Sequence, residues 1–179
     1  SWLLMLVINT IVYPLLTIAL LKGLGFIKSI YLKDVKERVI PLIGIMVFYF
    51  WAYWVVHNMG VAQKSDLSTE LTTVGAAKVP IAAHILLLGN FWGFIALFIV
   101  TIFMKVSMHS AGVASLVGFT IIMMLLSASF MPLALAIALA AAALVGWARY
   151  AVGAHSAKEL WLGYGIGIAA QIGAYLYII

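Results

Sequence analysis

The stretch Ala148-Arg-Tyr-Ala-Val-Gly-Ala-His-Ser-Ala-Lys-Glu159 lies between two long apolar segments and concentrates charge where the chain has little. Only 8% of the 179 residues are Asp, Glu, Lys or Arg, yet this stretch contains Arg149, His155 and Glu159. Ionisable groups next to the hydrocarbon of a bilayer are costly, and they usually face a polar cavity or pair with one another. The stretch therefore predicts a polar site at a membrane boundary.

The spacing inside this stretch indicates which of its groups interact. His155 and Glu159 are four residues apart, so on a helix they share a face and can hydrogen-bond. A carboxylate there would fix the imidazole tautomer and favour its positive form. The guanidinium of Arg149 matches the oxygens of a phosphate. Two histidines and a glutamate can also hold zinc, but the nearby cations favour an anion, and we expect no metal and no cofactor.

The composition of the chain indicates a membrane protein. Apolar residues make up 66% of the sequence, a share that soluble globular domains do not have. The apolar runs are continuous, which is typical of spanning helices and not of barrel strands. We therefore predict an all-α, polytopic membrane bundle that forms a single domain over residues 1–179. Because Ser1 opens directly into an apolar run, we also expect a segment upstream of it.

About 20 apolar residues span a bilayer as a helix, so the apolar runs predict six spanning helices. Their ranges are 2–21, 39–58, 79–104, 113–126, 133–147 and 160–179. Within the last, the spacing Gly163-x-x-x-Gly167 predicts close helix packing. The absence of cysteine excludes disulfides and thiolate metal sites.

Alternation of the six spans places the connections at 22–38, 105–112 and 148–159 on one face of the membrane. Their ionisable residues then gather on that face: Lys33, Lys36, Arg38, Lys105, His109, Arg149, His155 and Glu159. The excess of Lys and Arg there favours a cytoplasmic face. We attribute the net charge of +5 to this topology, and we expect no binding of nucleic acid.

The spacing Arg149-x5-His155-x3-Glu159 resembles the third signature of the type 2 phosphatidic acid phosphatase superfamily, which is related to the vanadium haloperoxidases. The family sequence is usually Ser-Arg-x5-His-x3-Asp; here Ala148 replaces the Ser and Glu159 the Asp. The resemblance implies that His155 is the nucleophile that takes the phosphoryl group. It further implies that Glu159 orients His155 and that Arg149 binds phosphate.

Two weaker motifs precede this one in the order that the superfamily has. Val106-Ser-Met-His109 is similar to Pro-Ser-Gly-His, which implies that His109 protonates the leaving oxygen and that Ser107 donates to a phosphate oxygen. Lys33-x6-Ile40-Pro41 resembles Lys-x6-Arg-Pro. Ile40 takes the place of the family Arg, so the resemblance implies that Lys33 or Arg38 supplies a phosphate-binding cation.

The resemblance implies a divergent, short bacterial member of the superfamily in the inner (cytoplasmic) membrane. Such a protein is a lipid-phosphate phosphatase that acts on a phosphatidic acid, an isoprenyl phosphate or a related phosphomonoester among membrane lipids. Many bacterial members have a periplasmic site, in conflict with the charge distribution here, and the sidedness stays open. The alternative is a catalytically inert relative that serves as a structural subunit of a membrane protein complex or homo-oligomer.

Overall fold

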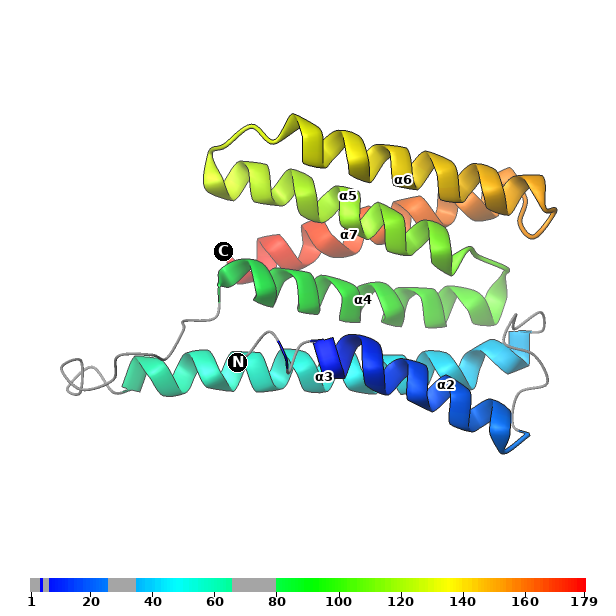
Figure 1. Ribbon diagram of the computed structural model, residues 1–179, viewed down its shortest axis with the longest axis horizontal. Helices are drawn as coiled ribbons and strands as arrows, with labels where there is room; N and C mark the ends of the chain where they lie inside the picture. Colours follow the sequence, from blue (N-terminus) through cyan, green and yellow to red (C-terminus); the bar gives the residue numbers. More distant parts are fainter. Residues whose placement is uncertain (1–3, 5–6, 26–34, 66–79) are drawn as a thin grey trace. The chain divides into compact units, whose positions relative to one another are not determined.

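The computed structural model of the chain describes residues 4, 7–25, 35–65 and 80–179, and within them it contains helices and no strand. This confirms the all-α class. In chain order (Figure 1), the elements are a π-helical segment η1 (Ile8–Val12), α2 (Tyr13–Gly23), α3 (Val35–Ser65), α4 (Ile81–Phe103), α5 (Met108–Ser127), α6 (Pro132–Ala151) and α7 (Ala157–Ile178).

Four segments of the described chain are long and apolar enough to cross a membrane, as expected for a polytopic membrane protein. They are Val39–Asn58, Ile81–Phe103, Met108–Ser127 and Pro132–Ala151. The expected first span is described as a shorter apolar helix, Ile8–Gly23. The expected sixth span corresponds to α7, which has spanning length but contains Gln171 and several glycines and tyrosines. Six spans are therefore not confirmed.

Several helix boundaries differ from the expected ones, and two of the differences place His109 and Arg149 on helices. α5 begins at Met108 and not at Val113, because the Ser107 side chain accepts a hydrogen bond from the backbone N–H of Ser110 and caps the helix. α6 continues past Trp147 to Ala151, and the chain then turns at Gly153, whose φ is +65°. His109 and Arg149 thus lie on terminal helical turns.

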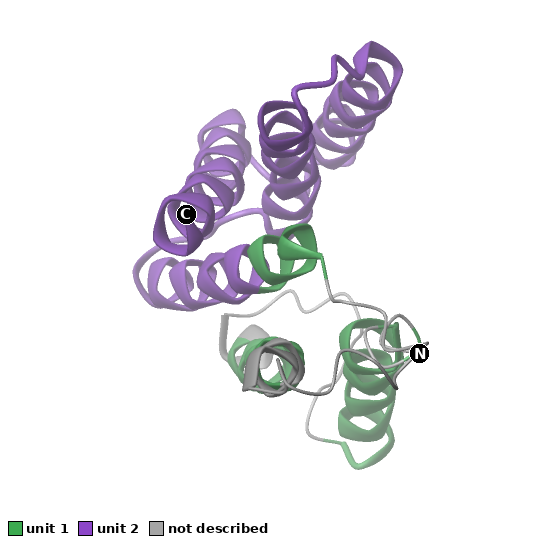
Figure 2. Ribbon diagram, turned by 90° about the vertical axis from the view of Figure 1, so that its left-hand side faces the viewer, with its two compact units in different colours: residues 1–87 green, residues 88–179 purple. Residues whose placement is uncertain are grey.

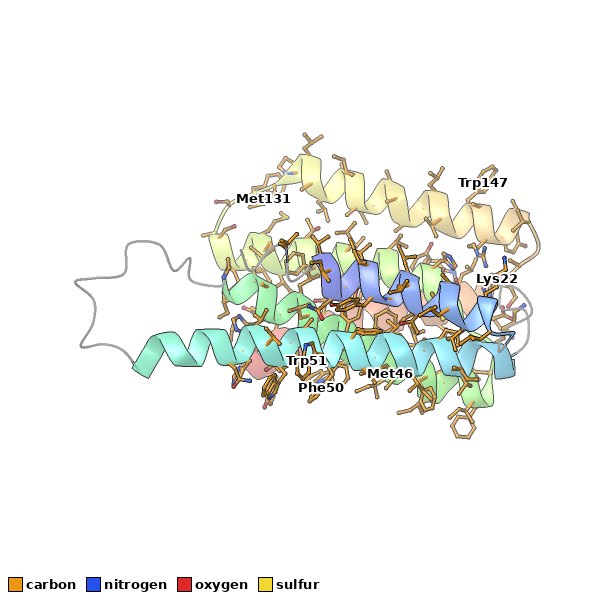
Figure 3. The ribbon with its side chains drawn as sticks, turned by 60° about the horizontal axis from the view of Figure 1, so that its bottom comes forward. Lys22, Met46, Phe50, Trp51, Met131 and Trp147 are labelled. Atoms are coloured by element: carbon orange, nitrogen blue, oxygen red, sulfur yellow. The ribbon has the colours of Figure 1, made fainter. Side chains whose placement is uncertain are left out.

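The chain divides into two compact units, residues 1–87 and 88–179 (Figure 2). In the first unit, α3 packs against η1 and α2, and Ala52, Val56 and Leu87 form a buried apolar cluster. Phe50 and Trp51 project outward from α3 (Figure 3) and are about half exposed. Exposed apolar side chains of this kind are expected on a helix that faces lipid.

The second unit is arranged around α5, which packs along α7 and α6. The connections 104–107 and 152–156 lie at one end of this unit, and the turn between α5 and α6 lies at the other end (Figure 1). The connections predicted at 105–112 and 148–159, two of the three that were expected on one face of the membrane, therefore lie at the same end of this unit. On α6, Trp147 projects away from the other helices of the unit (Figure 3) and is 69% exposed.

Glycines on one face of α7 permit the close approach of α5. A Cβ atom on Gly163 would lie 2.5 Å from the carbonyl oxygen of Ser107. A Cβ atom on Gly167 would overlap the carbonyl oxygen of Ala111 and lie 2.9 Å from the backbone nitrogen of Ser115. Because these neighbours are backbone atoms, they cannot move aside as a side chain can. The packing predicted from the Gly163-x-x-x-Gly167 spacing is confirmed.

A pair of matched substitutions tests this packing. Gly167→Ala should lower the free energy of unfolding by about 1–3 kcal/mol, because the added methyl group overlaps the α5 backbone. Gly165→Ala should be neutral or slightly stabilising, because a Cβ atom there meets nothing within 4 Å and Ala favours helix over Gly. Thermal unfolding in detergent measures both, and equal effects of the two substitutions would contradict the close packing.

Candidate functional site

Two hydrogen bonds join the α4–α5 connection to the α6–α7 connection. The backbone N–H of Ser107 donates to the carbonyl oxygen of Glu159 over 3.3 Å. The Lys105 ammonium donates to the carbonyl oxygen of Ala154 over 2.8 Å. The second and third predicted motifs, which are far apart in the sequence, are thereby held side by side.

The turn after α6 places His155 next to the end of that helix. The backbone N–H groups of Ala154 and His155 both donate to the carbonyl oxygen of Arg149, over 3.1 and 3.3 Å. Gly153 allows this reversal because its positive φ is unfavourable for other residues. Arg149 and His155, from opposite sides of the turn, are therefore close to one another.

His155 and Glu159 form the hydrogen bond that their spacing predicted. The distance from His155 Nδ1 to Glu159 Oε2 is 2.8 Å. An ionised carboxylate only accepts hydrogen bonds, so the proton lies on Nδ1, and Nε2 carries a free lone pair. Glu159 also forms a capping box with Ser156 at the start of α7, which fixes the carboxylate in position.

The imidazole of His155 is neutral at neutral pH. Burial lowers the pKa of His155 below its usual value; the Glu159 hydrogen bond and charge oppose this, and the charges of Lys105 and Arg149 add to it. Glu159 does favour the positive form of His155, as expected, but burial has the larger effect and the two cations add to it. The physical reason is that the side chain of His155 is only 5% exposed, and burial disfavours a charged imidazole by more than one carboxylate stabilises it.

The carboxyl group of Glu159 is ionised at neutral pH. Its partial burial would raise the pKa, but the hydrogen bond from His155, the charge of Lys105 and the backbone N–H of Ser156 together lower it. Lys105 Nζ lies 3.9 Å from Glu159 Oε2. Sequence reasoning placed Lys105 on the correct face but missed it as a site residue, because no motif includes it.

His109 and Arg149 complete the cluster of charged and titratable groups. His109 lies on the first turn of α5 with an exposed side chain and interacts electrostatically with Arg149 and His155. Arg149 lies in the last turn of α6. Its Nε atom is buried and has no hydrogen-bond partner in the described part of the chain. A buried N–H group without an acceptor is costly, and an anion bound here would supply one.

Of the remaining predicted phosphate ligands, the structure describes the side chain of Ser107 alone. Ser107 is fully buried, and its hydroxyl accepts hydrogen bonds from the N–H and the hydroxyl of Ser110 over 3.3 and 2.9 Å, so it serves as a helix cap. Lys33 lies outside the described residues. Arg38 lies on α3, in the first unit, and its side chain is also outside them. No group of three metal-ligating side chains occurs among the residues that the structure describes.

Comparison of the chain with protein-family models, with curated proteins and with solved structures finds no match. The resemblance to the phosphatase superfamily thus depends on the motifs alone. The chemistry of the cluster depends on its own geometry: a neutral imidazole with a free Nε2, a carboxylate that holds it, and a second imidazole. Next to them lies a guanidinium N–H that lacks an acceptor.

Two substitutions should move the pKa of His155 in opposite directions. Glu159→Gln removes the carboxylate that raises this pKa, so it should fall further below its usual value. Lys105→Met removes a positive charge that lowers it, so it should rise. Titration of isotope-labelled histidine by NMR measures both shifts, with His155→Asn to assign the resonance. A rise in the Glu159→Gln protein would contradict the described geometry.

Proposed function

We propose that the chain is an integral membrane lipid-phosphate phosphatase that hydrolyses a phosphomonoester through a covalent intermediate on His155. The observation that carries this proposal is the 2.8 Å hydrogen bond from His155 Nδ1 to Glu159. Covalent catalysis needs a nucleophile that a second group orients, and this bond leaves Nε2 free for attack. The unpartnered Nε of Arg149 beside it supports an anionic substrate.

In the first step, Nε2 of the neutral His155 attacks phosphorus, and the bond from phosphorus to the lipid oxygen breaks. The protonated form of His109 gives its proton to this leaving oxygen, which departs as an alcohol. Arg149 and Lys105 stabilise the negative charge on the equatorial oxygens of the phosphoryl group in the transition state. Glu159 balances the positive charge that forms on the phosphorylated imidazole ring.

In the second step, water attacks the phosphohistidine. His109, now neutral, takes a proton from the water as the bond between phosphorus and Nε2 breaks. Inorganic phosphate leaves, and both imidazoles return to their starting forms. His109 thus acts as the acid in one step and as the base in the next.

A lipid substrate is favoured by where the catalytic groups lie on the helices. His109 is on the first turn of α5 and Arg149 on the last turn of α6, and both helices are long and apolar enough to cross a membrane. These positions correspond to the depth of the polar headgroups in a bilayer. We further propose that the protein is located in a bacterial inner membrane.

The burial of Ser107 favours the alternative, an inert relative that acts as a structural subunit. A hydroxyl that caps a helix is less free to donate to a phosphate. Met108 next to it also blocks the close backbone approach that a glycine would allow. The cluster of His155, Glu159 and Arg149 weighs against this alternative, because packing does not require a buried guanidinium N–H without an acceptor.

Turnover by substituted proteins distinguishes the two functions. His155→Ala should abolish hydrolysis of both an activated aryl phosphate and a lipid phosphate, in chelator, because the nucleophile is lost. His109→Ala should slow lipid phosphate hydrolysis by about 10²–10⁴-fold, and aryl phosphate hydrolysis less, because a good leaving group needs little protonation. His57→Ala is the matched control: His57 lies on α3, outside the cluster, and its loss should not change turnover.

The wild type also provides a direct test. Vanadate imitates five-coordinate phosphorus and should raise the thermal unfolding temperature of the wild type, and less so that of Arg149→Met. If the wild type hydrolyses neither substrate and vanadate does not stabilise it, the enzyme proposal fails. The structural-subunit function would then be the better account.

A further inference from the structure

One hydrogen bond links α6, which carries Arg149, to α7, which carries Glu159. The Tyr164 hydroxyl on α7 donates to the carbonyl oxygen of Ala142 on α6 over 2.6 Å. In the part of the chain that the structure describes, no other side-chain hydrogen bond joins these two helices. α6 packs mainly along α5 and makes few other contacts with α7. The bond is therefore the main restraint on how α6 lies against α7.

Gly146 makes room for this hydrogen bond. It is one of two buried residues among the 20 of α6, all of which the structure describes, and a Cβ atom on it would overlap the Tyr164 hydroxyl oxygen. The carbonyl of a helical residue points toward the N–H of the residue four positions later. A side chain at position 146 would therefore cover the carbonyl oxygen of Ala142 that accepts from Tyr164.

The contact with Tyr164 lies one helical turn before Arg149 and on the same face of α6. Residues three or four positions apart are neighbours on a helix surface, so Ala142, Gly146 and Arg149 form one row along α6. At 1.5 Å per residue, Arg149 lies about 4.5 Å beyond Gly146 along the helix axis. The face of α6 that Tyr164 holds against α7 is thus the face that carries Arg149.

The same end of α6 also holds His155. The backbone N–H groups of Ala154 and His155 donate to the carbonyl oxygen of Arg149. Glu159, the partner of His155, lies instead on α7, five residues before Tyr164. A shift of α6 along α7 would therefore move the guanidinium and the imidazole relative to the carboxylate.

We infer that Tyr164 is a positioning residue for the anion site: its hydroxyl holds the last turn of α6 so that Arg149 and His155 face the same phosphoryl group. This inference rests on the proposed phosphatase function. The hydroxyl is occupied by Ala142, so Tyr164 acts through Arg149 and not on the substrate. A guanidinium binds phosphate in the ground state as well as in the transition state, so its displacement should raise KM and change kcat little.

Tyr164→Phe tests the hydroxyl alone, because the ring and its edge contact with Trp161 remain. This substitution should raise both the KM for a water-soluble aryl phosphate and the inhibition constant of vanadate by roughly three- to tenfold, the effect of one hydrogen bond. Tyr177→Phe is the matched control: Tyr177 also lies on α7, is 69% exposed and contacts Trp92 through its ring. Both constants should keep their wild-type values in the control.

A cycle of double substitutions separates positioning from a general effect on the fold. In the Arg149→Met protein, Tyr164→Phe should raise neither constant further, because the group that it positions is gone. Gly146→Ala should match Tyr164→Phe, because its methyl group displaces the hydroxyl, and the two together should do no more than either alone. Steady-state kinetics in detergent, below the unfolding temperature of each protein, measure these effects.

The outcomes separate this inference from the proposed function. A wild type that neither hydrolyses the aryl phosphate nor binds vanadate overturns both. If the wild type is active and Tyr164→Phe equals Tyr177→Phe, the inference is overturned and the phosphatase stands. The same holds if Tyr164→Phe has an equal effect with and without Arg149. If thermal unfolding shows that Tyr164→Phe does not fold, Gly146→Ala takes its place in the cycle, and the same results decide.

Discussion

The contact between the backbones of α5 and α7 is the constraint on which the second unit depends. Gly163 and Gly167 allow it, since a side chain at either position would meet backbone atoms of α5 or of its cap. The same contact lets the N–H of Ser107 reach the carbonyl oxygen of Glu159, which fixes the two connections to one another. His109 lies on the first turn of α5 and His155 lies in the connection between α6 and α7. Their mutual positions therefore follow from helix packing and do not require a rigid loop.

Burial then sets the chemical state of the cluster. A solvated histidine beside a carboxylate would favour its positive form, but His155 is removed from water and faces Lys105 and Arg149 as well as Glu159. The result is a neutral ring that donates from Nδ1 and keeps Nε2 free, which is the state that a nucleophile needs. The cations that lower this pKa are also those that would stabilise a bound phosphate.

The sequence predicted the parts of this account that depend on local pattern. Apolar runs predicted the helices, and the four-residue spacing predicted the hydrogen bond between His155 and Glu159. The start of α5 was missed because one buried serine, Ser107, caps the helix within an apolar context. Lys105 was missed because its contacts with Ala154 and Glu159 arise only when two distant connections meet. The pKa of His155 was missed because burial is a tertiary property that no local pattern encodes.

Trapping of the covalent intermediate tests the central claim most directly. The purified protein is mixed with a lipid phosphate that carries a labelled phosphorus, quenched in base within the first turnover, and digested for mass spectrometry. The account predicts a base-stable, acid-labile label on the peptide that contains His155, and no label in the His155→Ala protein. A protein that turns over substrate without this label, or that carries it on another residue, would contradict the account.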